Sequence, residues 1–303
     1  MSKIINQILA IGLLSVCFFC NQKADQQETI LKGSTTILVD ETLKPIIEDQ
    51  IAVFENDYDA KIAIKPKSEA EVMQDLFDRK TNIAILTKKL SSKDSLYFVH
   101  KNIIPRMTPF ATDAIALIGN SKSNDTLIDI QDIIKFVKGD SKTAIKGLVF
   151  DNPNSSTMRY IKELSNITTT PEKDIYSFKT NDEVIGYVAQ NNGMIGVVGV
   201  NWLMQPSKET KKIRSKINIL SVKAIGESNY YFPSQNNIAE KKYPLARDLY
   251  IINCQGTSGL GMGFASFLTG ERGQRIILQS GLLPWKVPTR KIKTRKEINN
   301  DKN

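Results

Sequence analysis

Short apolar runs alternate with segments of helical spacing along most of this chain, and that alternation limits the folds it can adopt. Leu43–Tyr58, for example, places apolar residues three or four positions apart, as one face of a helix does. Strands are expected at Thr35–Val39, Lys61–Lys65, Ile83–Leu86, Ala114–Gly119, Leu148–Phe150, Gly193–Gly199 and Pro244–Asn253. Further helices are expected at Glu69–Phe77, from Ser92, at Thr126–Phe136, after Asn181–Glu183, at Ser258–Leu268 and at Gly270–Gly281. This order predicts an α/β protein with mainly parallel sheets.

The length of the chain indicates more than one compact core. After the N-terminal targeting segment about 275 residues remain, which is more than a single core usually holds. No long structureless linker separates the chain into halves. We therefore expect two lobes joined by short strands, and not two independent domains in series.

The N-terminus is typical of a secretory signal. Lys3 precedes an apolar stretch at Ile8–Phe19, and the chain turns polar at Asn21. Such a short apolar core with a basic start predicts a signal peptide over residues 1–20, of lipoprotein type, followed by a polar tether over residues 21–32. Cys20 is the preferred site of lipidation. Cys17 and an unmodified cysteine remain the alternatives, because neither cysteine follows the usual small residue.

Composition excludes several kinds of site. Cys254 is the one cysteine after the signal, so the protein is not a disulfide scaffold, and we expect a buried structural thiol. His100 is the single histidine, which leaves no His-based triad and no His metal cluster. The net charge is +9, with basic clusters at 208–216 and 286–296. In an exported chain these favour a solvated tail or an anionic membrane surface over a nucleic-acid partner.

Three hydroxyls stand where a strand gives way to a helix. Ser155, Ser156 and Thr157 follow the apolar run Leu148–Phe150 and precede a helical pattern through Tyr160. The first amides of a helix lack intrahelical acceptors and carry partial positive charge, so hydroxyls beside them suit an oxyanion. The simpler alternative is that a serine only caps the helix.

Several segments together resemble the phosphate-binding subunit of bacterial ABC phosphate uptake systems, over most of residues 33–284. The segments that carry the resemblance are Tyr243–Ile252, Gly261–Leu268, Gly273–Pro284, Asp113–Ile118 and Gly193–Gly196. The resemblance implies a two-lobed type II periplasmic binding protein fold with the ligand in the cleft. Lobe 1 would comprise residues 33–116 with 247–288, lobe 2 residues 117–246, and residues 289–303 a basic tail.

Two strands would cross between the lobes in this fold. Asp113–Gly119 would be the outgoing crossing and Tyr243–Asn253 the returning one. Arg247 and Asp248 would then lie near the hinge, although a surface ion pair explains them equally well.

The resemblance also implies the ligand contacts. Ser155, Ser156 and Thr157 match the hydroxyl-bearing helix start of the second lobe. Thr42 and Ser68 fall in the two first-lobe loops. The predicted ligand-binding residues are Thr42, Ser68, Thr87, Ser155, Ser156, Thr157 and Arg159.

Two positions depart from the family pattern. Thr87 stands where the family has its acidic proton acceptor, and Asp151 occupies the position of the family arginine, so Arg159 is the arginine expected to reach back. Acidic residues near the inferred loops either face the cleft and oppose a dianion, or face outward and cap helices; they are Asp40, Glu41, Glu69 and Asp151.

These observations predict an extracytoplasmic solute-binding protein. It would capture phosphate or a related small oxyanion at the periplasmic face of a bacterial membrane, on a lipid anchor, and deliver it to an ABC permease. No catalytic residue, cofactor or metal is expected. The alternatives are the same fold with a less anionic ligand, or an exported lipoprotein that acts through protein contacts. An enzyme with a nucleophilic Ser155 or Ser156 is least favoured, because no histidine is expected nearby as its general base.

Overall fold

The computed structural model describes residues 28–140, 143–170 and 173–288. The predicted signal peptide, the lipidation candidates Cys17 and Cys20, and the basic tail at 289–303 lie outside the described residues. Within the described ranges, no helix is both long enough and apolar enough to cross a membrane.

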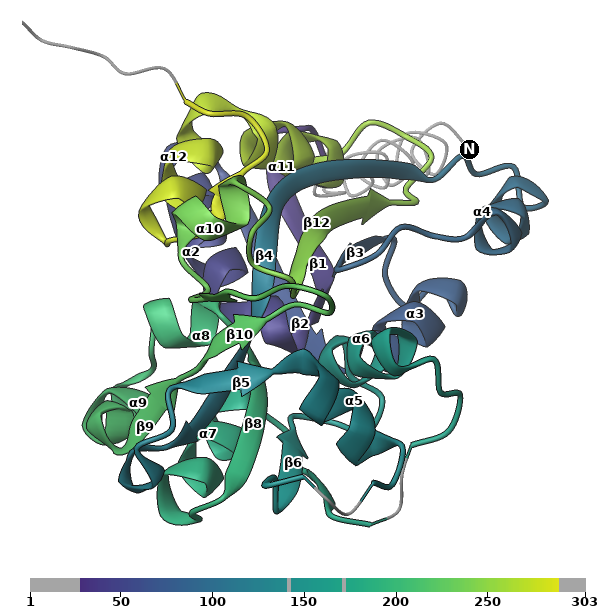
Figure 1. The fold of residues 1–303 in the computed structure, drawn as a ribbon. Helices are drawn as coiled ribbons and strands as arrows, with labels where there is room; N and C mark the ends of the chain where they lie inside the picture. The colour runs from purple at the N-terminus through teal and green to yellow at the C-terminus, as the bar shows by residue number, and fades with distance from the viewer. Residues whose placement is uncertain (1–27, 141–142, 171–172, 289–303) are drawn as a thin grey trace, which may run out of the picture.

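One large sheet runs through the whole molecule (Figure 1). Its main strand order is β2 (Ala60–Lys67), β1 (Gly33–Asp40), β3 (Ile83–Leu86), β12 (Ala246–Asn253), β4 (Arg106–Asn120), β8 (Met194–Gly199), β6 (Gly147–Phe150) and β7 (Ile175–Ser177), with β9 (Ile217–Ile219) and β13 (Leu283–Pro284) also paired to β4. A small separate sheet holds β11 (Tyr230–Tyr231), β10 (Ser221–Lys223) and β5 (Leu127–Asp129). The outer strands of the large sheet are parallel, and β12 and β4 are antiparallel to their neighbours. The α/β class is therefore confirmed, with mixed rather than purely parallel pairing.

Helices cover the sheet and fill the connections between its strands. They are α2 (Lys44–Asp57), α3 (Glu69–Phe77), α4 (Ser92–Val99), α5 (Ile130–Val137), α6 (Ser156–Ser165), α7 (Asn181–Gln190), α8 (Asn201–Met204), α9 (Lys208–Ile213), α10 (Gln235–Ala239), α11 (Leu260–Thr269) and α12 (Glu271–Gln279), with 3-10 turns η2 (Glu41–Leu43), η3 (Ser121–Ser123) and η4 (Arg214–Lys216). In Figure 1, α2, α11 and α12 surround the upper half of the sheet, and α5 and α7 surround the lower half.

The long strand β4 links the two halves. Up to Ala114 it pairs with β12, and from Ile115 it pairs with β8, so its partner changes in mid-strand. Because β4 and β12 lie side by side and antiparallel, they form the expected pair of crossing strands. The predicted lobe boundaries at 116/117 and 246/247 stay predictions, but the change of partner in β4 lies within two residues of the first of them.

Tertiary pairing changed two expected elements. The helix predicted at Thr126–Phe136 is wrong in its first turn, because Leu127–Asp129 instead pairs in parallel with β10 and the helix begins at Ile130. Asp129 ends the strand and caps this helix by accepting from the amide of Gln131 at 2.8 Å. The strand predicted at Pro244–Asn253 begins at Ala246. Cys254 is buried, as expected, and burial raises the pKa of its thiol to about 12.

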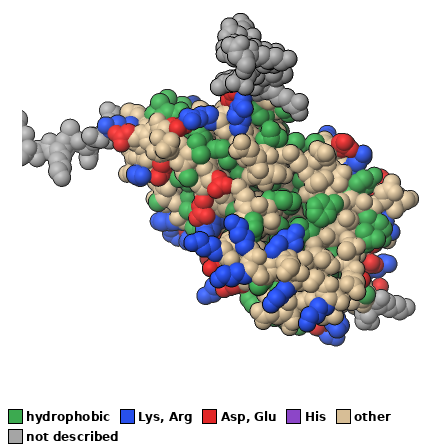
Figure 2. All heavy atoms as spheres, turned by 90° about the vertical axis from the view of Figure 1, so that its left-hand side faces the viewer, with side chains coloured by type: hydrophobic (Ala, Val, Ile, Leu, Met, Phe, Trp, Pro, Cys, Tyr) green, Lys and Arg blue, Asp and Glu red, His purple; other side chains and the backbone are tan. Residues whose placement is uncertain are grey.

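Basic side chains gather on the face that carries α9. Lys208, Lys211, Lys212 and Lys216 are exposed there. Figure 2 shows this side of the molecule, with lysine and arginine side chains prominent across its lower part. The basic cluster predicted at 208–216 is therefore a solvated surface of α9 and η4.

Candidate functional site

The two halves of the molecule meet where parallel strands end and helices begin. β1 ends at Asp40 and β6 ends just before Asp151, and α3 and α6 start beside them (Figure 1). The amide of Ala70, in the first turn of α3, donates to the carbonyl of Asn154, just before α6, at 3.3 Å. Crevices at the carboxyl ends of parallel strands are the usual ligand sites of open α/β sheets. This junction is therefore the candidate site.

A buried polar group, here called the inner cluster, lies at the centre of the junction. Its members are Asp40, Thr42, Asp113, Asp151, Ser155, Ser156, Thr157 and Arg247. Their backbones come from β1 and η2, from β4, from the β6–α6 connection with the start of α6, and from β12. Segments far apart in the chain thus contribute to one cluster.

Arg247 forms hydrogen bonds with three other members of the inner cluster. Its Nη2 donates to Thr42 Oγ1 at 3.0 Å, and its Nη1 donates to Ser156 Oγ at 2.8 Å. Nη2 also donates to Asp113 Oδ2 at 2.9 Å. Arg247 and Asp113 stand directly opposite each other in the β12–β4 pair, and both are buried. The guanidinium is therefore held by one strand partner while it contacts hydroxyls from both halves.

Thr42 and Ser156 meet across the junction. Their side-chain oxygens lie 3.3 Å apart. Asp40 orients Thr42, because Asp40 Oδ1 accepts from the Thr42 amide at 3.1 Å and from its Oγ1 at 3.0 Å. The Thr42 carbonyl accepts from Asn201 Nδ2 at 2.8 Å and from Trp202 Nε1 at 3.1 Å. The hydroxyl of Thr42 thus contacts Ser156, and its carbonyl contacts Asn201 and Trp202. These contacts hold the two halves close together.

The hydroxyl-led helix start is both a cap and part of the cluster. Ser155 is the N-cap of α6, and its Oγ accepts from the amide of Met158 at 3.2 Å. Thr157 Oγ1 donates to Asp151 Oδ1 at 2.8 Å and lies 2.9 Å from Ser155 Oγ. Ser156 is left to face Arg247 and Thr42. Ser155 therefore caps the helix, while Ser156 contacts Arg247 and Thr42 across the junction.

Arg159 lies in a second group at the edge of the junction, here called the rim cluster: Glu69, Thr87, Lys88, Arg159 and Glu163. Arg159 Nε donates to Glu69 Oε1 at 2.5 Å, and its Nη2 donates to Glu69 Oε2 at 3.1 Å and to Thr87 Oγ1 at 3.0 Å. Thr87 donates to Glu69 Oε2 at 2.9 Å. Two predicted ligand residues, Thr87 and Arg159, therefore meet at a carboxylate, apart from the inner hydroxyls.

Ser68 is the N-cap of α3. Its Oγ donates to Glu71 Oε2 at 2.6 Å, and the Glu71 amide points back to that Oγ at 3.4 Å, which completes a capping box. The structure does not bring the Ser68 hydroxyl into hydrogen-bond contact with the other predicted ligand residues. It does place Ser68 next to Glu69 of the rim cluster.

The acidic residues of the predicted loops all turn inward. Asp40, Glu41, Glu69 and Asp151 are buried, with at most 6% of their surface exposed. Burial raises the pKa of Asp40 to about 7, helped by the charge of Glu69 and opposed by Arg247. Burial likewise raises the pKa of Glu41 to about 8, helped by Asp151 and opposed by hydrogen bonds from Asn181. Burial also raises the pKa of Asp151.

Glu69 behaves in the opposite way. Its burial would raise the pKa, but the hydrogen bonds and charge of Arg159, with the charge of Lys88, outweigh burial and hold the pKa below its ordinary value. Glu69 is therefore an ionised partner of Arg159. In the inner cluster, by contrast, Arg247 is the one cation beside Asp40, Asp113 and Asp151 among the described residues.

Sequence reasoning missed the role of Arg247. The interpretation of Arg247 and Asp248 as a surface ion pair is wrong: Arg247 pairs with Asp113, and Asp248 accepts from Thr112 Oγ1 at 2.9 Å. The available signal was Asp113 just before an apolar run in one crossing strand, and Arg247 inside the other. Opposite charges in two apolar strands predict a buried pair once the strands are placed side by side.

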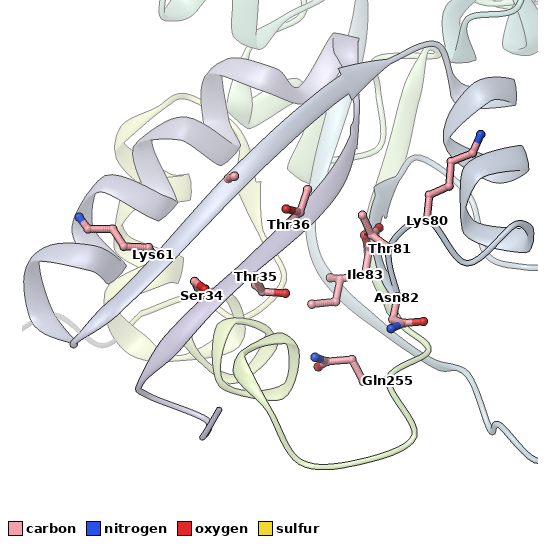
Figure 3. A pocket seen from close by; sticks show the side chains of 10 residues that line it. Ser34, Thr35, Thr36, Lys61, Lys80, Thr81, Asn82, Ile83 and Gln255 are labelled. Carbon is pink, nitrogen blue, oxygen red and sulfur yellow. The ribbon is translucent and has the colours of Figure 1, made fainter. Parts of the chain in front are cut away.

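A separate hollow of about 440 Å³ lies on the first half of the sheet (Figure 3). It is lined by Thr35, Thr36 and Asn82, with Lys61 and Lys80 at its sides. Both lysines are paired elsewhere, because Lys61 binds Glu55 at 3.1 Å and Lys80 binds Asp75 at 2.6 Å. Figure 3 shows the two ammonium groups extending away from the hydroxyls. This hollow also lies away from the carboxyl ends of the strands, so we do not assign the ligand to it.

Among the described residues, no group of three or more His, Cys, Asp or Glu side chains is placed to hold a metal ion. The inner cluster instead presents hydroxyls and a guanidinium, which are hydrogen-bond donors to an anion or a polar oxygen.

Comparisons with known proteins agree with this architecture. A model of the PBP superfamily domain matches residues 24–272. A search of the curated proteins found no match to the chain. Among solved structures, a Clostridium perfringens protein described as a phosphate ABC transporter substrate-binding protein, with bound phosphate, superposes with a TM-score of 0.67 at 16% identity, covering 84% of this chain and all of that one.

Two further structures show the breadth of the fold. An ABC-type phosphate transport receptor from Vibrio cholerae gives a TM-score of 0.61 at 15% identity, over 83% of this chain and 100% of its own. The regulatory domain of CcmR from Synechocystis PCC6803, in complex with 2-PG, gives 0.52 at 14% identity, over 78% of this chain and 96% of its own. At these identities the likeness establishes the fold, and function has to be argued from the site.

Proposed function

The chain belongs to the PBP superfamily, and we propose that it is a solute-binding protein that captures phosphate or a related small oxyanion for an ABC transporter. It holds the ligand without breaking a bond in it. Two solved proteins of similar fold, from Clostridium perfringens and Vibrio cholerae, are described as phosphate transport proteins, which supports this choice among the solutes that such folds bind.

The observation that carries the proposal is Arg247 in contact with hydroxyls from both halves. A guanidinium with its fork of N–H donors suits two oxygens of one oxyanion, and Thr42 and Ser156 add donors from opposite sides. The start of α6 adds backbone amides and the positive end of the helix dipole. The donors therefore converge from both lobes on one small volume.

Capture follows from a change in these contacts. When the lobes open, Thr42 and Ser156 separate, and Arg247 stays in place because Asp113 on the neighbouring strand holds it. An oxyanion then accepts the hydrogen bonds that Arg247, Thr42 and Ser156 make to one another in the closed form. Closure is favoured by the ligand because only the closed form supplies donors from both sides.

The proposed ligand contacts are Thr42, Ser155, Ser156 and Thr157, as the sequence predicted, with Arg247 added. Ser68, Thr87 and Arg159 stay predicted contacts at the edge of the cleft. The division into lobe 1 (33–116 with 247–288) and lobe 2 (117–246) is part of the same proposal, as are export, lipid attachment at Cys20 and delivery to a membrane permease.

Ligand-dependent unfolding of the purified full chain tests the function. After removal of phosphate, the midpoint of thermal unfolding is followed against phosphate, arsenate, sulfate, molybdate, cations and neutral polar solutes. A ligand bound by the folded state alone raises the midpoint as its concentration rises. We expect phosphate to do so, and Ser156→Ala with Thr42→Val to abolish the shift.

The control is Ser207→Ala, which removes the hydroxyl that caps α9 and donates to Asp182. It should lower the midpoint slightly and leave the phosphate shift intact. A flat response to every oxyanion would overturn the proposal, and a shift with neutral or cationic solutes alone would favour a less anionic ligand.

A further inference from the structure

We infer that the end of lobe 1 where the tether joins the folded chain rests on an anionic lipid bilayer, with apolar side chains of α4 and of the α4–β4 connection in the interface. The inference rests on the proposed attachment at Cys20 and goes beyond it, because it names the surface that faces the membrane. It comes from the place where the tether is held, from the apolar side chains exposed near that place, and from the charge around them.

The described part of the tether is held against the start of α11. Glu28 Oε1 accepts from the amide of Leu260 at 2.6 Å. Gly259, the N-cap of α11, has no side chain that could satisfy this amide, so Glu28 serves as the cap. The backbone then passes close to α11, because a Cβ added at Gly263 would lie 1.6 Å from the carbonyl oxygen of Ile30. The point at which the chain leaves lobe 1 is therefore fixed.

The length of the remaining chain places this point near the membrane. Glu28 stands eight positions after Cys20. An extended chain spans at most about 3.3–3.6 Å per residue, so a lipid on Cys20 would hold the start of α11 within about 30 Å of the bilayer surface. Lobe 1 is therefore the part of the molecule nearest to the anchor.

The segment that includes α4 and its connection to β4 exposes several apolar side chains. Ile104 is 78% exposed, and Leu96 and Val99 are 54% and 45% exposed. Leu96 and Val99 stand three residues apart on α4, which puts them on one side of the helix. Single exposed apolar residues are ordinary, but several within one short segment indicate a contact surface.

A hollow joins this segment to the tether. Its volume is about 530 Å³, and Ile104, Arg106 and Met262 are among the residues that line it. Arg106 Nη1 lies 3.9 Å from Met262 Sδ, and Met262 precedes Gly263, against which Ile30 packs. In Figure 1, α4 and the start of β4 lie at the upper right, on the same half of the molecule as α11. The exposed apolar side chains and the tether thus share one end of the molecule.

The charge on this segment suits an anionic surface. The stretch Ser92–Met107 carries three lysines and arginines and one acid. The cations are Lys93, Lys101 and Arg106, and all three are exposed. The acid, Asp94, is used locally, because its side chain completes the capping box of α4. Exposed apolar side chains flanked by lysine and arginine are typical of surfaces that bind the interface of anionic bilayers.

The basic face of α9 is the competing candidate for a membrane contact. Its lysines are exposed as well, but α9 belongs to lobe 2 and lies at the lower left of Figure 1, away from α11 and the tether. The anchor therefore favours the end of lobe 1, and α9 supplies the comparison site for an experiment.

Site-specific labelling on vesicles tests the inference. An environment-sensitive fluorophore is attached to Ile104→Cys or, in a separate preparation, to Lys211→Cys on α9. Both are made in the full chain with Cys17→Ser and Cys20→Ser, so that the label has one reactive thiol. Cys254 is buried, and burial raises the pKa of its thiol to about 12, which keeps it unreactive.

The labelled chains are bound to vesicles of phosphatidylcholine and phosphatidylglycerol, on which the apolar stretch Ile8–Phe19 should hold them. We expect the emission at position 104 to shift to shorter wavelength, and quenching by nitroxide-labelled lipids to place the label about 5–10 Å into the headgroup boundary. The label at position 211 should keep the emission that it has in water.

Charge variants test the electrostatic part of the contact. Lys101→Glu with Arg106→Glu should reduce the shift at position 104, because the surface would then repel the anionic lipids. Lys208→Glu with Lys212→Glu changes the same number of charges on α9 and is the matched control, which should leave the shift at position 104 unchanged.

The outcomes keep the inference apart from the proposed function. A label at position 104 that stays in water while the chain sediments with the vesicles overturns the inference, and so does an equal shift at position 211. A chain that does not sediment with the vesicles overturns membrane attachment, and the inference falls with it. Phosphate-dependent unfolding is measured separately, so solute binding stands or falls on its own result.

Discussion

Two arginines approach the junction, and they are held in different ways. Arg247 is buried, with 6% of its surface exposed; it sits opposite Asp113 in the crossing strands and contacts Thr42 and Ser156. Arg159 lies at the edge, where Glu69 takes two of its hydrogen bonds and Glu163 a third. Arg247 therefore has one carboxylate partner and two hydroxyl partners, whereas Arg159 has two carboxylate partners and the hydroxyl of Thr87.

This difference bears on how each arginine can serve a ligand. An oxyanion displaces hydroxyl partners of Arg247 at small cost, because neutral hydrogen bonds are exchanged for charge-assisted ones. To reach Arg159, the same anion would compete with Glu69, a buried and ionised carboxylate. We therefore propose that Arg247 recognises the ligand and that the pair of Arg159 with Glu69 holds the lobes closed.

The largest effect is expected for Arg247→Ala. Removing it leaves Asp113 buried without its cation, and breaking such a pair costs about 3–5 kcal/mol. Denaturant unfolding monitored by circular dichroism should show this loss, and the phosphate-dependent shift should vanish. Arg272→Ala removes an exposed guanidinium from its pair with Asp57, whose side chain is mostly buried, and should cost about 1 kcal/mol. Equal losses for the two variants would contradict the contrast between a buried and a surface arginine.

The rim pair should matter less. Glu69→Gln removes the charge that Arg159 meets across the junction, and because Arg159 is partly exposed we expect a loss of only about 1–2 kcal/mol. Small-angle X-ray scattering should report a more open average shape, with phosphate binding retained. Glu163→Gln removes the exposed partner on the same helix and should change neither quantity measurably. Loss of phosphate binding in Glu69→Gln would indicate instead that Arg159 is part of the ligand site.

Without a ligand, the pH dependence of the free energy of unfolding distinguishes the inner cluster from the rim cluster. Unfolded carboxyls ionise near pH 4, whereas folded Asp40 ionises at about 7 and Glu41 at about 8. Since the folded state holds more protons in between, the free energy of unfolding should fall as pH rises through this window, by at most about 1.4 kcal/mol per pH unit for each group. Glu69 has a lowered pKa, so it stabilises the folded state above the ordinary pKa of a glutamate. That stability is lost only as the pH falls below this value, outside this pH window.

Urea unfolding at several pH values between about 5.5 and 8.5 measures that slope, and Asp40→Asn should flatten it. Glu69→Gln should reduce the slope only in part, because it removes a charge that helps to raise the pKa of Asp40, while Glu69 itself stays ionised throughout this range. A stability that rises toward high pH in the parent chain would contradict the raised pKa values.

The smallest effect is expected for Ser156→Ala alone. The variant removes one hydroxyl that accepts from Arg247 at 2.8 Å, a loss of about 1 kcal/mol in stability. Ser155→Ala, which removes the N-cap of α6, should cost a similar amount. Ligand titration distinguishes them: Ser156→Ala should weaken phosphate binding more than Ser155→Ala does.

Periodicity and turn chemistry predicted the local elements well where one face is uniformly apolar. α3 and β3 begin and end at the predicted residues, because each has a clear apolar pattern and α3 has a capping box. Leu127–Asp129 was misassigned because its strand conformation depends on pairing with β10, almost a hundred residues away. No local pattern carries that information.

The hydroxyls that meet at the junction were named from the sequence, and the arginine between them was not. Ser155, Ser156 and Thr157 stand at a helix start, where hydroxyls have a recognisable purpose, and Thr42 was implied by the family resemblance. The sequence placed Arg159 nearest to them along the chain, whereas Arg247 is nearest in space. Only the β12–β4 register puts Arg247 opposite Asp113 and within reach of Thr42.

The sequence by itself therefore determined the α/β class and the hydroxyl-bearing start of α6, because these follow from spacing between neighbouring residues, and the family resemblance added the crossing strands. The tertiary structure decided which arginine meets those hydroxyls and that Asp40, Glu41, Glu69 and Asp151 face inward. Both depend on contacts between segments distant in the chain, where burial and the charge of one neighbour set the protonation of another.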